Sequence, residues 1–447
     1  MSDIRVLPQS VVNKIAAGEV IERPASIVKE LMENSVDAAA TRIDVAVEQG
    51  GLELVRVSDD GRGIPADELP LAVAPHATSK IRAADDLFRV GSLGFRGEAL
   101  ASIAEVSRLL VRSRTAASDS GSQLNVAGGQ ASQVEPCGCP VGTTLEVRQL
   151  FYNTPVRRKF MRTTQTEMGH VAEAFTRLAL AHPQIAFSLR HKGRVIYDLP
   201  PADPWRERLA AFFGEELAAD LIEVESVDEP VRLSGYVANP SHSRSNHRMQ
   251  YLFLNGRAIR DRALQHALGE AYRGLLLTGR YPIAFLRVEL PPEMVDVNVH
   301  PTKLEVRFQD SGRLYSQLLG TLRTRFLTTD LTARLEPTEQ REAVDAVDPA
   351  RADAMRRELV DWAKGALATA QEKLADAPPS TSDVSPGRSQ TEFSHQAPRA
   401  PLELSVLDRR WKPVGDPAHD APEPDTSSIE DTAASDSVEA ARGAAEP

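Results

Sequence analysis

Polar side chains that could do chemistry recur at helical spacing in the segment 25–38. On a helix with about 3.6 residues per turn, one side would carry four of them: Glu30, Glu33, Asn34 and Asp37. The opposite side would be apolar or small: Val28, Leu31, Met32, Ser35 and Ala39. Acids and an amide at the wall of a cleft can hold a metal ion and a water. Most polar helix faces are only solvated, so the helix alone leaves both interpretations open.

A further carboxylate ends a predicted strand, in the run Asp59-Asp60-Gly61-Arg62-Gly63. The Asp59 carboxylate only accepts hydrogen bonds, so it suits the exocyclic amine of adenine and would repel the carbonyl of guanine. Gly61 and Gly63 lack a Cβ and would let the backbone pass close to a flat ligand. A tight turn explains these glycines equally well.

Glycines also recur in the segment 91–97, which leads into a predicted helix through Ile103. Their spacing fits neither a dinucleotide fingerprint nor a P-loop. Backbone N–H groups at a glycine-rich turn that opens a helix form an anion cradle, so we expect phosphates near Gly94 to Gly97. A flexible surface loop is the alternative.

A basic cluster interleaved with aromatic residues follows a predicted strand at 141–147. Residues 151–200 hold 8 Lys and Arg against 3 Asp and Glu. Such density neutralises DNA phosphates without reading sequence, although a solvated face is the commoner origin of a charge run. The candidate DNA contacts are Arg157, Arg158, Lys159, Arg162 and Arg262.

Alternating patterns predict the elements that position these residues. A helix at 9–20 and the helix at 25–38 precede two strands, 42–48 and 52–58, joined at Gly50-Gly51, which favours a layered α+β sandwich. From 205 onward a second α/β unit is expected, with helices at 204–213 and 262–272 and strands within 221–238, 249–254 and 281–290. We therefore expect three regions: 1–204, 205–335, and a mostly disordered acidic tail, 336–447, with an isolated helix at 351–375.

Composition limits the class of protein. Residues 331–447 carry 13 Lys and Arg against 23 Asp and Glu, while residues 1–330 are nearly balanced at 39 against 40. The acidic pI therefore says nothing against DNA contact by the body of the chain. Cys137 and Cys139 have no second pair to complete a zinc site and are interpreted as reduced loop thiols. With no long apolar run and no signal peptide, we expect a soluble cytoplasmic protein.

Over about residues 4–330 the chain resembles the MutL mismatch-repair proteins, which belong to the GHKL ATPase superfamily. The resemblance is carried, in order, by Ile15-Ala-Ala-Gly-Glu-Val, Arg23-Pro-Ala, Lys29-Glu-Leu with Glu33-Asn-Ser, Asp59-x-Gly-x-Gly, His76-Ala-Thr-Ser-Lys, Gly94-Phe-Arg-Gly-Glu-Ala-Leu and Asn298-Val-His-Pro-x-Lys. It implies a GHKL-type ATPase α/β sandwich followed by a transducer domain similar to ribosomal protein S5 domain 2.

The resemblance also implies residue roles. Glu30 looks like the general base, Asn34 looks like the single protein ligand of Mg²⁺, and Asp59 would bind adenine with support from Thr143. Gly61 and Gly63 would allow the close approach of the base. A lid and its neighbours would cover the phosphates of ATP: Thr78, Ser79, Lys80, Gly94, Phe95, Arg96 and Gly97. Lys303, from the second domain, would contact the γ-phosphate.

The activity implied is that of a slow, Mg²⁺-dependent ATPase switch in DNA mismatch repair. ATP would close an N-terminal homodimer around DNA, and the protein would couple a MutS-type mismatch sensor to a downstream nuclease or helicase near the nucleoid. The alternative is a nucleotide-responsive DNA clamp or scaffold without meaningful hydrolysis. A sensor kinase or a topoisomerase fits poorly, because no phospho-acceptor helix or DNA-cleaving tyrosine domain is expected here.

Two departures from the family pattern stand out. Asp60 takes a position where asparagine is common, which adds a negative charge near the expected adenine pocket. MutL proteins usually continue past such a linker into a C-terminal dimerisation domain, an endonuclease in some members, and no endonuclease domain is expected within these 447 residues. Whether the chain is a piece of a longer protein or an unusual member stays open.

Overall fold

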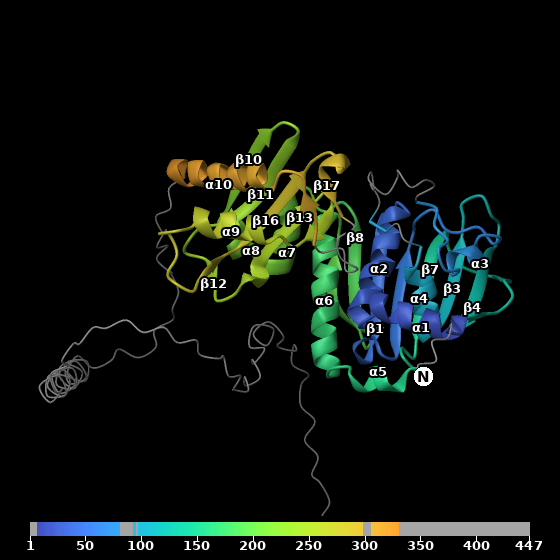
Figure 1. The fold of residues 1–447 in the computed structure, drawn as a ribbon. Helices are drawn as coiled ribbons and strands as arrows, with labels where there is room; N and C mark the ends of the chain where they lie inside the picture. The colour runs from blue at the N-terminus through green and yellow to red at the C-terminus, as the bar shows by residue number, and fades with distance from the viewer. Residues whose placement is uncertain (1–6, 81–92, 95–96, 298–304, 330–447) are drawn as a thin grey trace, which may run out of the picture. The chain divides into compact units, whose positions relative to one another are not determined.

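Two β-sheets organise the part of the chain that the computed structural model describes, residues 7–80, 93–94, 97–297 and 305–329 (Figure 1). These residues belong to one compact unit, Met1–Thr338. The mixture of sheets and helices confirms the predicted α+β class. The helix expected at 351–375 and the acidic tail lie outside the described residues.

The first sheet has nine strands among the described residues, and the predicted hairpin forms its centre. β1 (Arg42–Glu48) and β2 (Leu54–Asp59) pair antiparallel around the 3-10 turn Gln49–Gly51. Inward and outward positions alternate along β1, so Ile43 and Val45 are buried in the core. The predicted strands are therefore confirmed.

Strand order brings distant residues to the end of β2. The order is β5-β4-β3-β7-β2-β1-β8-β9, with β6 paired to β4. β7 lies beside β2, which places Thr143 opposite Asp59, while β1 and β8 run parallel. The remaining strands are β3 (Arg108–Arg114), β4 (Gly121–Ala127), β5 (Gln130–Ala131), β6 (Glu135–Cys137), β7 (Gly142–Arg148), β8 (Ala186–His191) and β9 (Arg194–Leu199).

Helix α2 (Pro24–Asp37) carries the acidic residues singled out above. Proline at its first turn suits the fixed φ of that position. Val28 and Leu31 are fully buried, as predicted, but Glu33 is also buried, at 4% exposure, which corrects its assignment to the open polar side. Lys29 Nζ lies 3.0 Å from Glu33 Oε1 and provides the charge partner that a buried carboxylate needs.

The other helices of the first region include the predicted α1 and the 18-residue α6, which is not predicted above. The Thr163 side chain accepts a hydrogen bond from the Thr166 N–H and caps α6, and Val171 and Phe175 are fully buried beneath it. These helices are α1 (Gln9–Val20), α3 (Leu69–Ala72), α4 (Ala99–Val106), α5 (Pro155–Lys159) and α6 (Thr164–Ala181).

The second sheet has the order β10-β11-β16-β13-β14. Its strands are β10 (Leu221–Asp228), β11 (Val231–Ala238), β13 (Gln250–Leu254), β14 (Arg257–Ile259) and β16 (Ala284–Glu289). Two further pairs are β12 (Ser243–Arg244) with β15 (Tyr281–Pro282), and β17 (Val295–Asp296) with β18 (Arg307–Phe308). The accompanying helices are α7 (Trp205–Phe213), α8 (Glu215–Ala219), α9 (Arg262–Ala271) and α10 (Ser311–Thr328), together with 3-10 turns at His247–Met249 and Pro292–Met294.

Side chains of the second sheet enter two hydrophobic cores. Phe253 and Phe285 join the core of the first region together with Trp205, whose indole N–H donates to Leu180 O at 2.9 Å. Side chains from α9 and α10 form the second core with the remaining buried residues of the sheet. The expected boundary at 204 thus falls at the start of α7, where the two regions share their packing.

Candidate nucleotide-binding site

Asp59 lies at the end of β2, where three groups hold its carboxylate. Ser35 Oγ donates to Oδ2 at 2.7 Å, and the Gly61 and Thr143 N–H groups donate to Oδ1 at 3.0 Å and 3.3 Å. Burial raises the pKa of Asp59, and these hydrogen bonds oppose the rise. Residues from α2, β2 and β7 therefore fix one acceptor group in place.

The glycines after Asp59 pack against protein backbone. A Cβ on Gly61 would lie 2.8 Å from Ala38 O, and one on Gly63 would lie 2.2 Å from Arg114 O. Gly63 also has a φ of 74°, which side chains rarely adopt. Packing of the turn against the end of α2 and against β3 is thus sufficient to require both glycines, whatever ligand approaches them.

Asp60 points away from Asp59 and toward the start of β1. Its carboxylate accepts hydrogen bonds from the Thr41 and Arg42 N–H groups at 2.7 Å and 2.8 Å. Burial raises the pKa of Asp60, but the hydrogen bonds from Thr41 and Arg42 outweigh burial, so the net shift is downward. The unusual acid therefore secures the entry into β1, while its charge still raises the pKa of Asp59.

Asp37, the last residue of α2 and of its polar row, is the centre of a second cluster. Lys80 Nζ donates to Asp37 Oδ2 at 2.5 Å and to Asn34 Oδ1 at 2.9 Å. The Leu93 N–H donates to Asp37 Oδ1 at 2.9 Å, and the Gly94 N–H donates to Oδ2 at 3.0 Å. An ammonium group and two backbone N–H groups thus surround one anion.

Gly94 closes directly over this cluster. A Cβ on Gly94 would lie 3.0 Å from Lys80 Nζ and 3.5 Å from Asn34 Oδ1. Residues predicted separately, from α2, from the 76–80 motif and from the glycine-rich segment, are therefore brought together. The donors suit phosphate oxygens, and the Asn34 amide oxygen suits a hard cation such as Mg²⁺.

Glu30 lies one turn before Asn34 and faces Lys29. Lys29 Nζ donates to Glu30 Oε1 at 2.8 Å. Burial lowers the pKa of Lys29, but the charges of Glu33 and Glu30 outweigh burial, so the net shift is upward. The charged Lys29 thus pairs with both acids on this part of α2, Glu30 and Glu33.

The remaining predicted nucleotide contacts have varied surroundings. Thr78 Oγ1 accepts from the Lys80 N–H at 3.2 Å, Ser79 is exposed, and a Cβ on Gly97 would lie 2.4 Å from Ala77 O. The Thr143 hydroxyl lies 3.0 Å from Ser113 Oγ. Phe95, Arg96 and Lys303 lie outside the described residues.

Comparison with known proteins gives one match in the first region of the molecule and one in the second. Residues 22–136 match the family model of the histidine kinase-, DNA gyrase B- and HSP90-like ATPases, and residues 209–327 match that of the DNA mismatch repair protein C-terminal domain. DNA mismatch repair protein MutL of Pseudomonas paraeruginosa is 52% identical over 323 residues, which are 71% of this chain and 51% of that protein. The chain belongs to the MutL family.

Another MutL relative supports the family assignment, and a solved structure supports the fold. MutL of Anaeromyxobacter sp. strain K is 46% identical over 370 residues, 82% of this chain and 61% of that protein. A crystal structure of the N-terminal domain of a DNA repair protein aligns with a TM-score of 0.62 and 26% identity, covering 71% of this chain and 98% of that one. The chain spans about half the length of the Pseudomonas MutL protein. The predicted GHKL-type fold and second α/β region are confirmed.

Three residues of the site were given no role by the MutL motifs. Ser35 donates a hydrogen bond to Asp59, and Asp37 accepts one from Lys80. Arg257, on β14 of the second sheet, donates from Nη2 to Leu93 O at a distance of 3.0 Å. Asp37 belongs to the polar row on α2 and Ser35 to its opposite side, and helical spacing alone assigns a partner to neither of them. Arg257 offered no signal, because its partner is 164 residues away.

The candidate DNA contacts divide between two places. Four of them lie on or just after α5: Arg157, Arg158, Lys159 and Arg162. Arg158 Nη2 already pairs with Glu53 Oε1 at 2.7 Å, and the Arg157 guanidinium packs on Gly18 of α1. Arg262 is the first residue of α9, beside the second sheet. Among the residues placed in the structure, no helix has the length and apolar character to cross a membrane.

Proposed function

We propose that this MutL-family chain is an ATP-dependent switch that binds and slowly hydrolyses ATP. The observation that carries the proposal is the carboxylate of Asp37 held by Lys80 and by the Leu93 and Gly94 N–H groups, because donors that hold one anion support a phosphate-binding cradle beside α2. The ATPase family model over residues 22–136 supports the same reading. We further propose domains of 1–204 for nucleotide binding and 205–335 for the transducer.

The adenine end of ATP is assigned to Asp59. Its carboxylate accepts hydrogen bonds and is fixed by Ser35 and Thr143, so it would accept the exocyclic amine of adenine at little cost in side-chain entropy. Guanine would place a carbonyl oxygen at the same position and be repelled. This contact supplies base selectivity.

The phosphate end is assigned to the cluster around Asp37. The nucleotide and the Asp37 carboxylate would compete for Lys80 and for the Leu93 and Gly94 N–H groups. Asn34 is the residue that would hold Mg²⁺, which would offset the charge of the phosphates when bound. Asp37 thereby keeps the donors satisfied and in position before nucleotide arrives.

Hydrolysis is assigned to Glu30 as the base that orients and deprotonates water. Lys29 holds this carboxylate in place through the ion pair at 2.8 Å. The Lys303 contact to the γ-phosphate remains part of the proposal as the family resemblance implies it. Loss of that contact on hydrolysis would then separate the two regions, which makes the cycle a switch.

An N-terminal homodimer is the proposed ATP-bound state. Apolar side chains on and before α1 support it because they are exposed in a single chain: Leu7 at 48%, Val11 at 39%, Val12 at 41% and Ile15 at 50%. An apolar helix face of this kind is typical of an interface. MutS-type sensors and a downstream nuclease or helicase are the proposed partners in the cell, near the nucleoid.

The test of the enzymatic proposal is Glu30→Ala. Removal of a general base should lower the rate of phosphate release at least about 100-fold. Affinity for a non-hydrolysable ATP analogue should stay within about threefold, since Glu30 does not belong to the donor cluster around Asp37. The control is Glu22→Ala, which removes an exposed acid just before α2. Unchanged turnover in Glu30→Ala would rule out the assigned base.

DNA binding is proposed for the exposed side chains that follow Arg158. Lys159 and Arg162 are exposed, and Phe160 between them is 77% exposed. Changing both basic residues to alanine should weaken binding to every DNA sequence and reduce the salt slope by up to about one unit per lost phosphate contact. Arg190→Ala, at an exposed position on β8, is the control. If affinity and slope both match those of the unmodified chain, the cluster is a solvated face.

The second candidate function is a nucleotide-responsive DNA clamp without meaningful hydrolysis. The Lys29–Glu30 ion pair favours it, because it engages the carboxylate that would serve as base. This alternative predicts that nucleotide changes DNA affinity while phosphate release stays at background in the unmodified chain. Turnover above background that Glu30→Ala abolishes would exclude it.

A further inference from the structure

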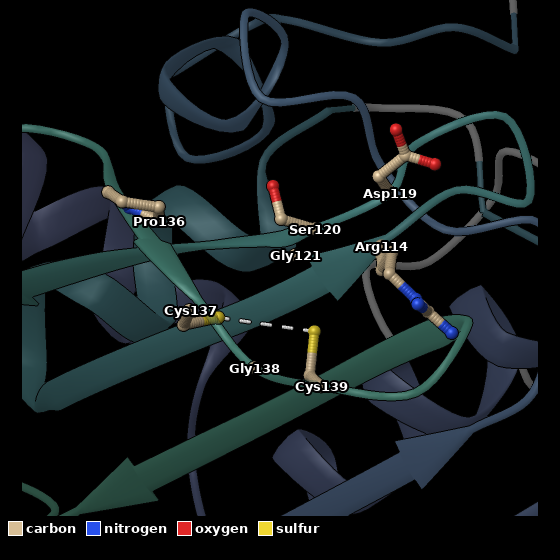
Figure 2. A pocket seen from close by; sticks show the side chains of 8 residues that line it. All are labelled: Arg114, Asp119, Ser120, Gly121, Pro136, Cys137, Gly138 and Cys139. Atoms are coloured by element: carbon tan, nitrogen blue, oxygen red, sulfur yellow. Dashed lines mark hydrogen bonds between the residues drawn. The ribbon is translucent and has the colours of Figure 1, made fainter.

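The chain contains only two cysteines, and both lie on one connection outside the candidate nucleotide-binding site. Cys137 ends β6, and Cys139 follows it in the short turn that leads into β7 (Figure 2). Both side chains are half-buried and reduced. The Cys137 thiol faces the Cys139 sulfur at an Sγ–Sγ distance of 4.0 Å.

The two sulfurs line a cavity of about 410 Å³. Arg114 and Asp119 also line it, as Figure 2 shows. Gly121 of β4 makes room for the Cys139 sulfur, because a Cβ at this position would lie 2.2 Å from Sγ. The sulfurs are therefore accessible from the cavity and are kept close by the fold of the β4–β6 edge.

The separation of the sulfurs matches a chelate. Two metal–sulfur bonds of about 2.3 Å at a tetrahedral angle place their sulfurs about 3.8 Å apart. We infer that Cys137 and Cys139 form a bidentate site for one thiophilic d¹⁰ cation of the Zn²⁺ and Cd²⁺ class. Binding forms two metal–sulfur bonds and releases the two thiol protons to solvent, so the charge of the divalent cation is balanced by two thiolates.

The surroundings make this an exchangeable site. Among the described residues, no third His, Cys, Asp or Glu joins the pair in a metal-binding cluster. Structural zinc sites use four protein ligands, so two positions here are left to water or to small ligands. The cation should therefore be removed easily by a chelator, and the fold should not depend on it.

Proton release gives the site a defined pH dependence. The cation must displace the proton of each thiol that it binds. Affinity should increase as the pH rises and decrease as it falls.

Cadmium titration of the reduced full chain, without nucleotide, tests the site. Every thiolate-to-metal charge-transfer signal must come from this pair, because no other cysteine exists. We expect saturation at one Cd²⁺ per chain with release of about two protons. Cys137→Ser and Cys139→Ser should each weaken binding at least about tenfold, since losing a direct ligand costs no less than losing a supporting group. Ser120→Ala, in the wall of the same cavity, should bind normally.

Three results would overturn the inference: no saturable signal, a signal that survives in both serine variants, or saturation at one ion per two chains. If the serine variants fail to fold, the unmodified chain is treated with a trivalent arsenical, which bridges neighbouring thiols. One adduct that consumes both thiols supports the chelate, whereas separate reaction of each thiol contradicts it.

Discussion

Asp59 and Asp37 are carboxylates at the two ends of the candidate site, but they are held by different kinds of partner. Asp59 receives hydrogen bonds from α2, from its own turn and from β7, all of which belong to the packed sheet and its covering helix. Asp37 receives hydrogen bonds from Lys80, Leu93 and Gly94, which lie outside the helices and strands. One end is built from regular elements, and the other from loop residues.

The difference suits the two parts of a nucleotide. A base is recognised by the position of one acceptor, so a rigid acceptor provides selectivity. Phosphates carry most of the charge of a nucleotide and are bound by cationic and N–H donors. Without a bound nucleotide, such donors would lack an acceptor. We propose that the Asp37 carboxylate satisfies those groups until phosphates replace it.

The region around Asp37 also contacts the second sheet, close to His182. The loss of stability at acid pH that follows from His182 should be the largest of the expected effects. His182 packs against Gly256, and burial, reinforced by the charge of Arg287, lowers the pKa of His182 to about 4, while Asp37 opposes the shift. Neutral His182 therefore contributes fully to the stability of the fold above its unfolded pKa of about 6.5. This contribution is lost as the pH falls toward 4. The free energy of unfolding should decrease by about 3 kcal/mol over this range.

His182→Gln should lack this acid-dependent loss, because glutamine does not titrate. Denaturant unfolding of both chains at pH 7 and near pH 4.5 measures the difference. Asp59 works in the opposite direction, since its raised pKa favours the folded state at lower pH, so the comparison between the two chains is needed to isolate His182. Parallel pH profiles would contradict the burial of a neutral His182 beside the second sheet.

Asp59→Ala should produce the next largest effect and define the adenine end. The loss of a charged acceptor costs about 2 kcal/mol, or about 30-fold in affinity. Adenosine and a non-hydrolysable ATP analogue should weaken by similar factors, because both carry the base. Calorimetric titration with the two ligands measures this. A loss confined to the ATP analogue would move Asp59 from the adenine end to the phosphate end.

Local sequence patterns predicted the elements that carry the site but not every partner within it. The bounds of α2 and the β1–β2 hairpin follow from periodicity, from Pro24 and from Gly50-Gly51. The placement of β7 beside β2 does not, because it joins residues 84 apart at Asp59 and Thr143. Strand order is set by packing across the whole sheet, which a local pattern does not encode.

Charged side chains were the least predictable part of the site. Glu33 belongs by spacing to the polar row of α2, yet it is buried because Lys29 neutralises it. Asp37 had no role assignable from sequence, since its partners come from two distant loops. Helix α6 was missed because Thr164, Thr166 and Gly169 weaken its helical signal, while its apolar face forms only against the sheet.

Asp37→Asn gives the smallest change in affinity and the most direct test of the central claim, that Asp37 holds the donors destined for the phosphates. Removing its charge should strengthen binding of a non-hydrolysable ATP analogue by about fivefold, or about 1 kcal/mol. The affinity of Asp37→Asn for adenosine should stay within about twofold of the unmodified chain. The control is Asp67→Asn, which alters an exposed acid elsewhere and should leave the affinity for both ligands within about twofold. ATP-analogue affinity that is unchanged or weaker in Asp37→Asn, or an equal gain for adenosine, would contradict the account.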